Sequence, residues 1–158
     1  MPKEMSGRSF LPLLRKDQGD YEPRTAVFAE RGVHAYGLPR NTILFDLSRS
    51  VTTKKYRLIY NALWDRRYAP VDIEDYKRPF WDDLRQRHQA GTLGEPFDRL
   101  FFRPQRPMFE LFDLSSDPYE LNNLAGTPAI AKTERKLKEQ LAEWMILERD
   151  FLPLPTEP

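Results

Sequence analysis

The chain has no cysteine among its 158 residues. This absence excludes a disulfide framework, a thiolate metal site and a cysteine nucleophile. It leaves the cellular compartment open, because many exported bacterial proteins also lack cysteine.

Long apolar runs and a surplus of one charge are also missing. No run approaches the roughly 18 apolar residues of a membrane-spanning helix, and we expect no membrane association. The apolar stretch near the N-terminus is short and broken by Pro12, unlike the apolar core of a signal peptide. The net charge of +1 removes the main argument for nucleic-acid binding. Two basic clusters are therefore interpreted as solvated strand edges, namely Lys54, Lys55 and Arg57, and Arg66 with Arg67.

Aromatic residues and prolines, by contrast, are plentiful. Ten Phe, seven Tyr and three Trp accompany fourteen Pro. This combination favours short strands and rigid connections around a bulky core over a helical bundle. The length and the 40% hydrophobic content are sufficient for one globular domain.

Alternating apolar, β-branched and aromatic residues predict four strands. The predicted strands cover residues 26–29, 42–47, 50–60 and 108–114. The third is the clearest, and the fourth ends at an Asp-Pro turn at residues 117–118. The pentapeptide LFDLS occurs twice, at 44–48 and 111–115, which we attribute to similar strand chemistry and not to a repeat architecture.

Helical periodicity predicts a helix over residues 80–89, with Gly91 at its C-cap, followed by a proline-rich connection over 93–107. Thr127 and Pro128 are typical of a helix start and predict a second, C-terminal helix. Its apolar stripe is interpreted as core and consists of Ile130, Leu137, Leu141, Trp144 and Met145. The predicted fold class is thus α+β, a small antiparallel sheet of about four strands with a C-terminal helix packed on one face.

Four segments, in order along nearly the whole chain, resemble one enzyme family. They are GRSFLPLL (7–14), AVFAERGVH (26–34), RSVTTKKYRLIYN (49–61) and FELFDLSSDPYELNNLA (109–125). They are similar to segments near the C-terminus of sulfatases, especially the branch that includes heparan N-sulfatase and related glycan sulfatases.

The resemblance implies a specific position within a larger protein. Sulfatases have a large alkaline-phosphatase-like catalytic domain followed by a small subdomain with a four-stranded antiparallel sheet and a terminal helix. Residues 1–25 then correspond to the junction and residues 26–158 to the subdomain. Met1 would mark a truncated gene, a misplaced start or a cut fragment. The implied partner is the missing catalytic domain. Relatives are often periplasmic, secreted or lysosomal, so the resemblance does not indicate a single compartment for this chain.

The catalytic apparatus of the family is not recognisable in this sequence. Its nucleophile is a formylglycine made within a C/S-x-P-x-R motif, whereas the nearest match, Ser116 to Glu120, has Glu in place of Arg. The Asp/Asn cluster that would hold calcium is also absent, and Thr52 replaces an Arg of the family. We therefore predict no catalytic residue and no metal ligand in this chain; calcium and formylglycine are implied for the full-length enzyme.

His34 is the candidate substrate-binding residue. It follows a predicted strand in a glycine-bounded loop and matches a family position whose loop reaches toward the substrate pocket. An imidazole there could donate a hydrogen bond to a sugar hydroxyl or a sulfate in the complete enzyme. The alternative is an exposed histidine without a role.

Other polar residues have simpler interpretations. Glu30 and Arg31 favour structural ion pairing, and His88 favours solvation on the polar side of its helix. Arg49 is either an anchor to the partner domain or a surface arginine. Asp46 and Asp113 could suggest a paired-carboxylate site, but their equivalent places in the repeated pentapeptide favour turn formation.

The sequence thus supports two hypotheses. The first is the C-terminal part of a sulfatase, plausibly acting on sulfated glycans, which lines the substrate pocket and has no activity alone. The second is a stand-alone binding module that has lost its catalytic partner. Under the first, an orphaned apolar surface predicts self-association, and its candidates are Phe10, Leu13, Leu14, Phe101 and Phe102.

Overall fold

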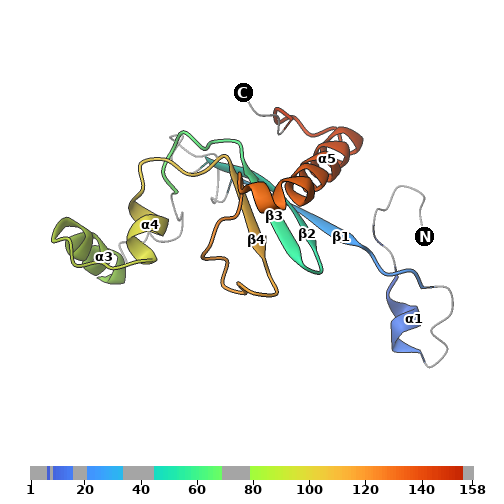
Figure 1. The fold of residues 1–158 in the computed structure, drawn as a ribbon, viewed down its shortest axis with the longest axis horizontal. Coiled ribbons are helices and arrows are strands. Elements are labelled where there is room, and N and C mark those ends of the chain that lie inside the picture. Colours follow the sequence, from blue (N-terminus) through green and yellow to red (C-terminus); the bar gives the residue numbers. More distant parts are fainter. Residues whose placement is uncertain (1–6, 8, 16–20, 34–44, 69–78, 155–158) are drawn as a thin grey trace.

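The computed structural model describes residues 7, 9–15, 21–33, 45–68 and 79–154 (Figure 1). Within these ranges an antiparallel sheet is flanked by short and long helices. The elements in order are α1 (Leu11–Leu14), β1 (Ala26–Val33), β2 (Phe45–Thr53), β3 (Tyr56–Asn61), α3 (Pro79–Gln89), α4 (Phe97–Phe102), β4 (Phe109–Asp113), a 3-10 turn (Pro128–Ile130) and α5 (Ala131–Leu147).

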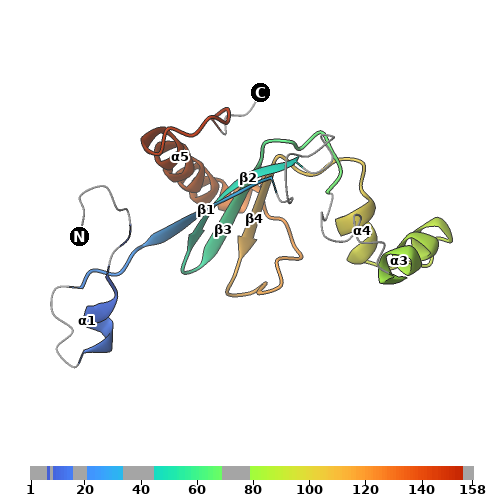
Figure 2. The ribbon, with the colours of Figure 1, turned by 180° about the vertical axis from the view of Figure 1, so that it is seen from behind.

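The sheet is a four-stranded meander in the order β1-β2-β3-β4, with each neighbouring pair antiparallel. Helix α5 lies across one face, and the opposite view shows the same layering (Figure 2). The predicted α+β class, with a helix-backed antiparallel sheet, is confirmed.

The segment predicted as one strand over residues 50–60 is in fact two strands joined by a tight turn. β2 ends at Thr53 and β3 starts at Tyr56. The Thr53 hydroxyl accepts the amide of Tyr56 at 2.9 Å and so closes the turn. The turn residues Lys54 and Lys55 are neither Gly nor Asn, so the usual hairpin signal is missing. Of the strand predicted over 42–47, residues 45–47 open β2 and residues 42–44 lie outside the described part.

The main core lies between the sheet and α5. Val51, Leu58 and Leu111 from three strands are fully buried, and they pack in one cluster with the stripe of α5. That stripe was predicted as core, and it contributes the buried residues Leu137, Leu141 and Met145. Trp144 is half-buried and stacks on Phe28 of β1, with ring centroids 5.3 Å apart.

The N-terminal cap of the last helix differs from the prediction. A 3-10 turn precedes α5, and the Thr127 side chain makes no capping hydrogen bond. The buried carboxylate of Glu134 accepts the Gly126 amide at 2.8 Å and pairs with Lys138 at 2.8 Å. Glu134 thus binds the amide that precedes Thr127, whereas a Thr127 cap would have served the amide of residue 129 or 130. The α-helix itself starts at Ala131, three residues later than the sequence signal.

Helix α3 matches the predicted helix, and Gly91 follows it with a φ of +66°. Helix α4 was missed, because its six residues lie within a proline-rich stretch that was predicted as a connection. Together α3 and α4 form an arm that lies beside the sheet, away from α5 (Figure 1). Buried Trp81 stacks on Phe102 and meets Phe101 edge-on, which gives the arm an aromatic core of its own.

The segment around α1 leaves its apolar side chains in solvent. Phe10 is 64% exposed and Leu14 is 72% exposed, with Leu11 and Leu13 about half exposed. Phe101 and Phe102, also predicted as orphaned apolar surface, are instead half-buried within the arm. Among the residues described, no helix has the length and apolar character required to cross a membrane.

Candidate functional site: a polar pocket beside the sheet

The two faces of the sheet differ in chemistry because side chains alternate along each strand. One set faces α5 and is largely apolar. We call the other side the polar face; the strand register assigns to it Val27, Ala29, Arg31, Asp46, Ser48, Ser50, Thr52, Arg57, Ile59, Asn61, Glu110 and Phe112.

A pocket with a volume of about 730 Å³ lies at one end of the polar face. Strands β2, β3 and β4 provide one side, and the end of α4 with the chain that follows it provides another. The turn at residues 120–123 completes the lining. The volume is within the range of about 300–1,000 Å³ that is typical of small-molecule sites.

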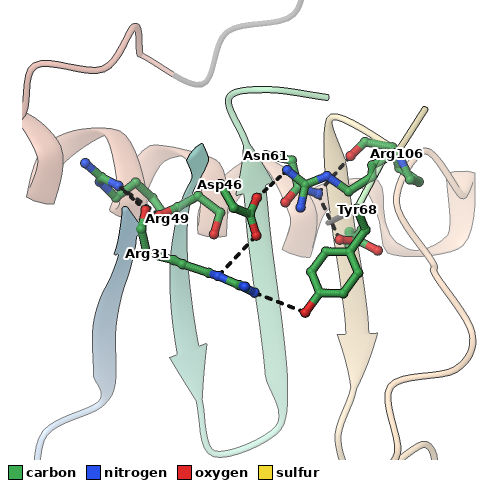
Figure 3. A network of polar contacts seen from close by, with 9 residues as sticks. Arg31, Asp46, Arg49, Asn61, Tyr68 and Arg106 are labelled. Carbon is green, nitrogen blue, oxygen red and sulfur yellow. Dashed lines mark hydrogen bonds and ion pairs between the residues drawn. The ribbon is translucent and has the colours of Figure 1, made fainter. Parts of the chain in front are cut away.

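The corner of the pocket is organised around one buried carboxylate. Asp46 is 4% exposed and receives Arg31 Nε at 3.1 Å and Arg106 Nη2 at 2.6 Å (Figure 3). One carboxylate thus contacts two guanidinium groups. Because all three side chains are at least partly buried, these contacts are screened less than they would be in open solvent.

Tyr68 links the two arginines. Its hydroxyl accepts Arg31 Nη1 at 3.2 Å, and its ring centroid lies 5.3 Å from the Arg31 guanidinium carbon and 5.9 Å from that of Arg106. The backbone amide of Arg106 donates to Trp64 at 3.0 Å. The segment after β3 and the segment before β4 are therefore held together at this corner.

The side of the pocket formed by the sheet carries an amide and a carboxylate in contact. Asn61 is 2% exposed, and its Nδ2 donates to Pro107 at 2.9 Å and to Glu110 Oε2 at 2.8 Å. This hydrogen bond fixes one oxygen of the half-buried Glu110 carboxylate. The other carboxylate oxygen is left to accept from water or from a ligand.

The rim is made by the arm and by the turn after β4. Arg99 of α4 donates to Leu121 at 2.8 Å and pairs with Glu95 at 3.0 Å. Arg103, at the end of α4, is exposed, and within the described ranges no hydrogen bond or ion pair holds its guanidinium. Of the arginines that line the pocket, Arg103 is therefore available to an external anion.

No family model matches the chain. The chain is 33% identical, over 89% of its length, to N-sulphoglucosamine sulphohydrolase of Homo sapiens, and 30% identical, over 98% of its length, to an ulvan-active sulfatase of Formosa agariphila. The homologues of this chain are sulfatases.

The match covers a limited part of these enzymes. The chain spans 26% of the human protein and 24% of the ulvan-active sulfatase, about a quarter of each. The solved structure of a 2-O GAG sulfatase superposes with a TM-score of 0.56 and 17% identity, over 95% of this chain and 22% of that structure. The chain is thus a partial, sulfatase-like unit that shares its fold with a part of larger enzymes.

The candidate predicted in this sulfatase-like chain, His34, lies outside the described residues. The structure does describe the two ends of its loop, because Val33 of β1 is paired with Phe45 of β2. These ends adjoin Arg31 and Asp46 in sequence, which are residues of the pocket lining. The role of His34 stays a prediction.

The predictions for the other polar residues had mixed outcomes. Ion pairing of Glu30 and Arg31 is confirmed with partners that the sequence did not indicate: Arg31 pairs with Asp46, and Glu30 lies 3.8 Å from Arg49. The prediction that His88 is simply solvated is wrong. Its Nδ1 lies 2.6 Å from Asp98, and its ring stacks on an aromatic residue of α4.

Arg49 is neither a surface arginine nor part of the pocket. It is 3% exposed, lies on the face covered by α5, and forms a two-pronged ion pair with Asp150, with Nη2 3.0 Å from Oδ1. It also donates to the carbonyls of Ser48 and Arg31. The hydrogen bonds from Arg49, aided by the Leu152 amide, hold the pKa of Asp150 below its ordinary value.

The two aspartates of the repeated pentapeptide have different roles. Asp113 ends β4 and accepts the Ser115 amide at 3.0 Å, which confirms its predicted part in a turn. The same prediction is wrong for Asp46, which opens β2 and lies in the Arg31–Arg106 pair. The two carboxylates belong to opposite faces of the sheet, so they do not form a paired site.

The described residues do not fit the calcium ion that the family implies. Calcium takes six to eight oxygen ligands, typically with several carboxylates. Nowhere in the described part do three or more His, Cys, Asp or Glu side chains gather as a potential metal site. Ser116, the nearest match to the formylglycine position, lies in the turn after β4, exposed to solvent.

Proposed function

We propose that this chain is the C-terminal, non-catalytic part of a sulfatase, which supports a catalytic domain and lines its substrate pocket. Residues 1–25 would form the junction and residues 26–158 the subdomain. The observation that carries the proposal is the match to about a quarter of each sulfatase by a chain without a C/S-x-P-x-R motif. The pocket on the polar face supports the proposal that this chain lines the substrate pocket of the complete enzyme.

The bond-breaking chemistry would belong to the catalytic domain. Sulfate-ester hydrolysis needs an activated nucleophile, and a metal ion can neutralise the sulfate oxygens. We assign the formylglycine and the calcium ion of the family to that domain. The names of the relatives, which refer to N-sulphoglucosamine, ulvan and 2-O GAG, favour sulfated glycans as substrates.

An activity assay tests the assignment directly. The purified chain is incubated with an aryl sulfate, alone and fused behind a sulfatase catalytic domain from which the corresponding C-terminal part has been removed. We expect no turnover by the chain alone and turnover by the fusion. Hydrolysis by the chain alone would overturn the proposal, and so would an inactive fusion whose unaltered parent enzyme is active.

The second candidate function is a stand-alone binding module. It is favoured by the core between the sheet and α5, which is made within this chain. The DNA immediately upstream of codon one separates the two candidates. A continuous reading frame that encodes C/S-x-P-x-R and a metal-binding Asp pair supports the sulfatase part, whereas a promoter directly before Met1 supports the module.

A further inference from the structure

We propose that the pocket on the polar face is itself a binding subsite for one sulfated sugar unit, with Arg103 as the residue that recognises the sulfate. The inference rests on the proposed function and extends it by assigning the ligand contacts to residues of this chain. Three properties of the pocket support it: the distribution of charge, the polar groups on the sheet, and the aromatic lining.

The distribution of charge singles out Arg103. Arg31 and Arg106 share Asp46, and Arg99 is paired with Glu95. Arg103 is exposed and has no such pairing within the described residues. A guanidinium presents its N–H donors in a planar fork that matches the oxygens of an anion such as sulfate, so a two-pronged contact is favourable there.

The sheet side of the pocket suits hydroxyl groups. Glu110 and Asn61 are already joined at 2.8 Å, which fixes the carboxylate without using its full accepting capacity. A sugar hydroxyl can donate to such an oxygen. A sulfate cannot, and it would be repelled by the negative charge. The same pocket thus separates the two ends of a sulfated sugar, with hydroxyls at β4 and the sulfate at the end of α4.

Aromatic and apolar groups complete the lining. Tyr68 and Phe101 lie with ring centroids 6.3 Å apart, and both line the pocket. The C–H faces of a sugar ring pack well against aromatic rings, which bury a large apolar area. A pocket of about 730 Å³ has room for one or two sugar units.

Calorimetric titration of the 158-residue chain tests the inference. The ligands are glucosamine N-sulfate, N-acetylglucosamine 6-sulfate, unsulfated N-acetylglucosamine and inorganic sulfate. We expect a sulfated sugar to bind more tightly than both the unsulfated sugar and free sulfate. Arg103→Ala should weaken its binding about tenfold or more, because a hydrogen-bonded charge is lost. Arg103→Lys should recover part of the affinity, because it keeps the charge without the fork.

Arg135→Ala is the matched control. Arg135 is also an exposed arginine, but it lies on α5, on the other side of the sheet. The Arg135→Ala variant should bind the sulfated sugars as tightly as the unaltered chain does. The circular dichroism spectra of all variants should coincide. Equal loss in Arg103→Ala and Arg135→Ala would indicate non-specific attraction and overturn the inference.

The possible outcomes separate the subsite from the proposed function. If neither sulfated sugar binds the chain, the subsite is wrong, whatever the fusion hydrolyses. If a sulfated sugar binds through Arg103 and the fusion is inactive, the subsite stands and the role in a sulfatase fails. Sulfated and unsulfated sugars that bind equally well would also overturn the role of Arg103.

Discussion

The two faces of the sheet use the same pair of chemical groups in different ways. On the face covered by α5, Arg49 and Asp150 form a buried pair at the margin of an apolar core. On the polar face, Asp46 is shared by Arg31 and Arg106 beside a pocket. The first pair joins the chain after α5 to β2. The second lies in the lining of that pocket.

The comparison shows that the number of partners and the surroundings decide what an arginine–carboxylate contact does. The Arg49–Asp150 pair is closed off from water, with the exposed Glu30 carboxylate 3.8 Å from the same guanidinium, and it serves the fold. On the polar face one carboxylate contacts two guanidinium groups, and this cluster lies beside a cavity. The predictions below test this division, from the largest expected effect to the smallest.

The largest effect is expected from Arg49→Ala. It leaves the carboxylate of Asp150 buried without its cation, which should lower the free energy of unfolding by about 3–5 kcal/mol. Urea denaturation followed by circular dichroism measures this loss. Arg49→Met combined with Asp150→Leu removes both charges and should be much more stable than Arg49→Ala. If the double variant is equally destabilised, the uncompensated charge is not the cause.

Truncation of the apolar core should have a comparable or slightly smaller effect. Leu141 is fully buried between α5 and the sheet, so Leu141→Ala should cost about 2–5 kcal/mol of stability. Leu100→Ala on the arm is the control, because Leu100 is 41% exposed and should change stability by about 1 kcal/mol or less. Equal losses in the two variants would show that the core does not lie between α5 and the sheet.

The Arg49–Asp150 pair also predicts a dependence on pH. The pKa of Asp150 is lowered in the folded chain from an ordinary value of 3.8. Its stabilisation is therefore complete well above that value, and it is lost as the pH falls from there through the folded pKa. Asp150→Asn should flatten the stability profile in this acidic range and leave the profile above pH 6 parallel to that of the unaltered chain. An unchanged acidic limb would contradict this assignment.

On the polar face, Tyr68→Phe should have a modest effect. The substitution keeps the ring between Arg31 and Arg106 and removes only the hydroxyl that accepts Arg31. We expect a loss of about 0.5–1.5 kcal/mol in unfolding experiments. A loss as large as that of Arg49→Ala would place this corner among the main supports of the fold and contradict the division between the two faces.

The smallest change in stability is expected at α1, which belongs to neither face. Leu14 is 72% exposed, so Leu14→Glu should change the free energy of unfolding by no more than about 0.5 kcal/mol. We expect the same substitution to reduce self-association in sedimentation velocity, because it breaks an exposed apolar patch. If the unaltered chain is monomeric at high concentration, the apolar surface around α1 does not mediate self-association and the prediction is wrong.

Much of the structure on the face covered by α5 could be predicted from the sequence, because the signals for its helix and strands are local. The stripe of α5 repeats with the helical period, and the strands alternate with period two. The hairpin at Lys54–Lys55 and the helix α4 were missed, because neither has the glycine, asparagine or long periodicity by which such elements are recognised. The late start of α5 was missed because a 3-10 turn at Pro128–Ile130 takes the place of the first α-helical turn.

The pocket could not be predicted in the same way. The pocket residues Asn61, Tyr68, Arg106 and Glu110 come from segments up to about fifty positions apart. Asn61 and Glu110 belong to the segments that resemble sulfatases, but nothing in those segments indicates that the two side chains meet. The identical pentapeptides at 44–48 and 111–115 show the limit most clearly. Their aspartates are in the same local sequence, yet one ends a strand at a turn and the other is buried between two arginines.

By itself, the sequence indicated the resemblance to sulfatases and determined the class of fold, because periodicity and short signatures are carried by neighbouring residues. Only the tertiary structure decided which charges are neutralised and which remain available. The partner of a charged side chain is set by the strand register and by how α4 and the chain after it pack beside the sheet. These distances exist only after folding, so the site could be read only from the folded chain.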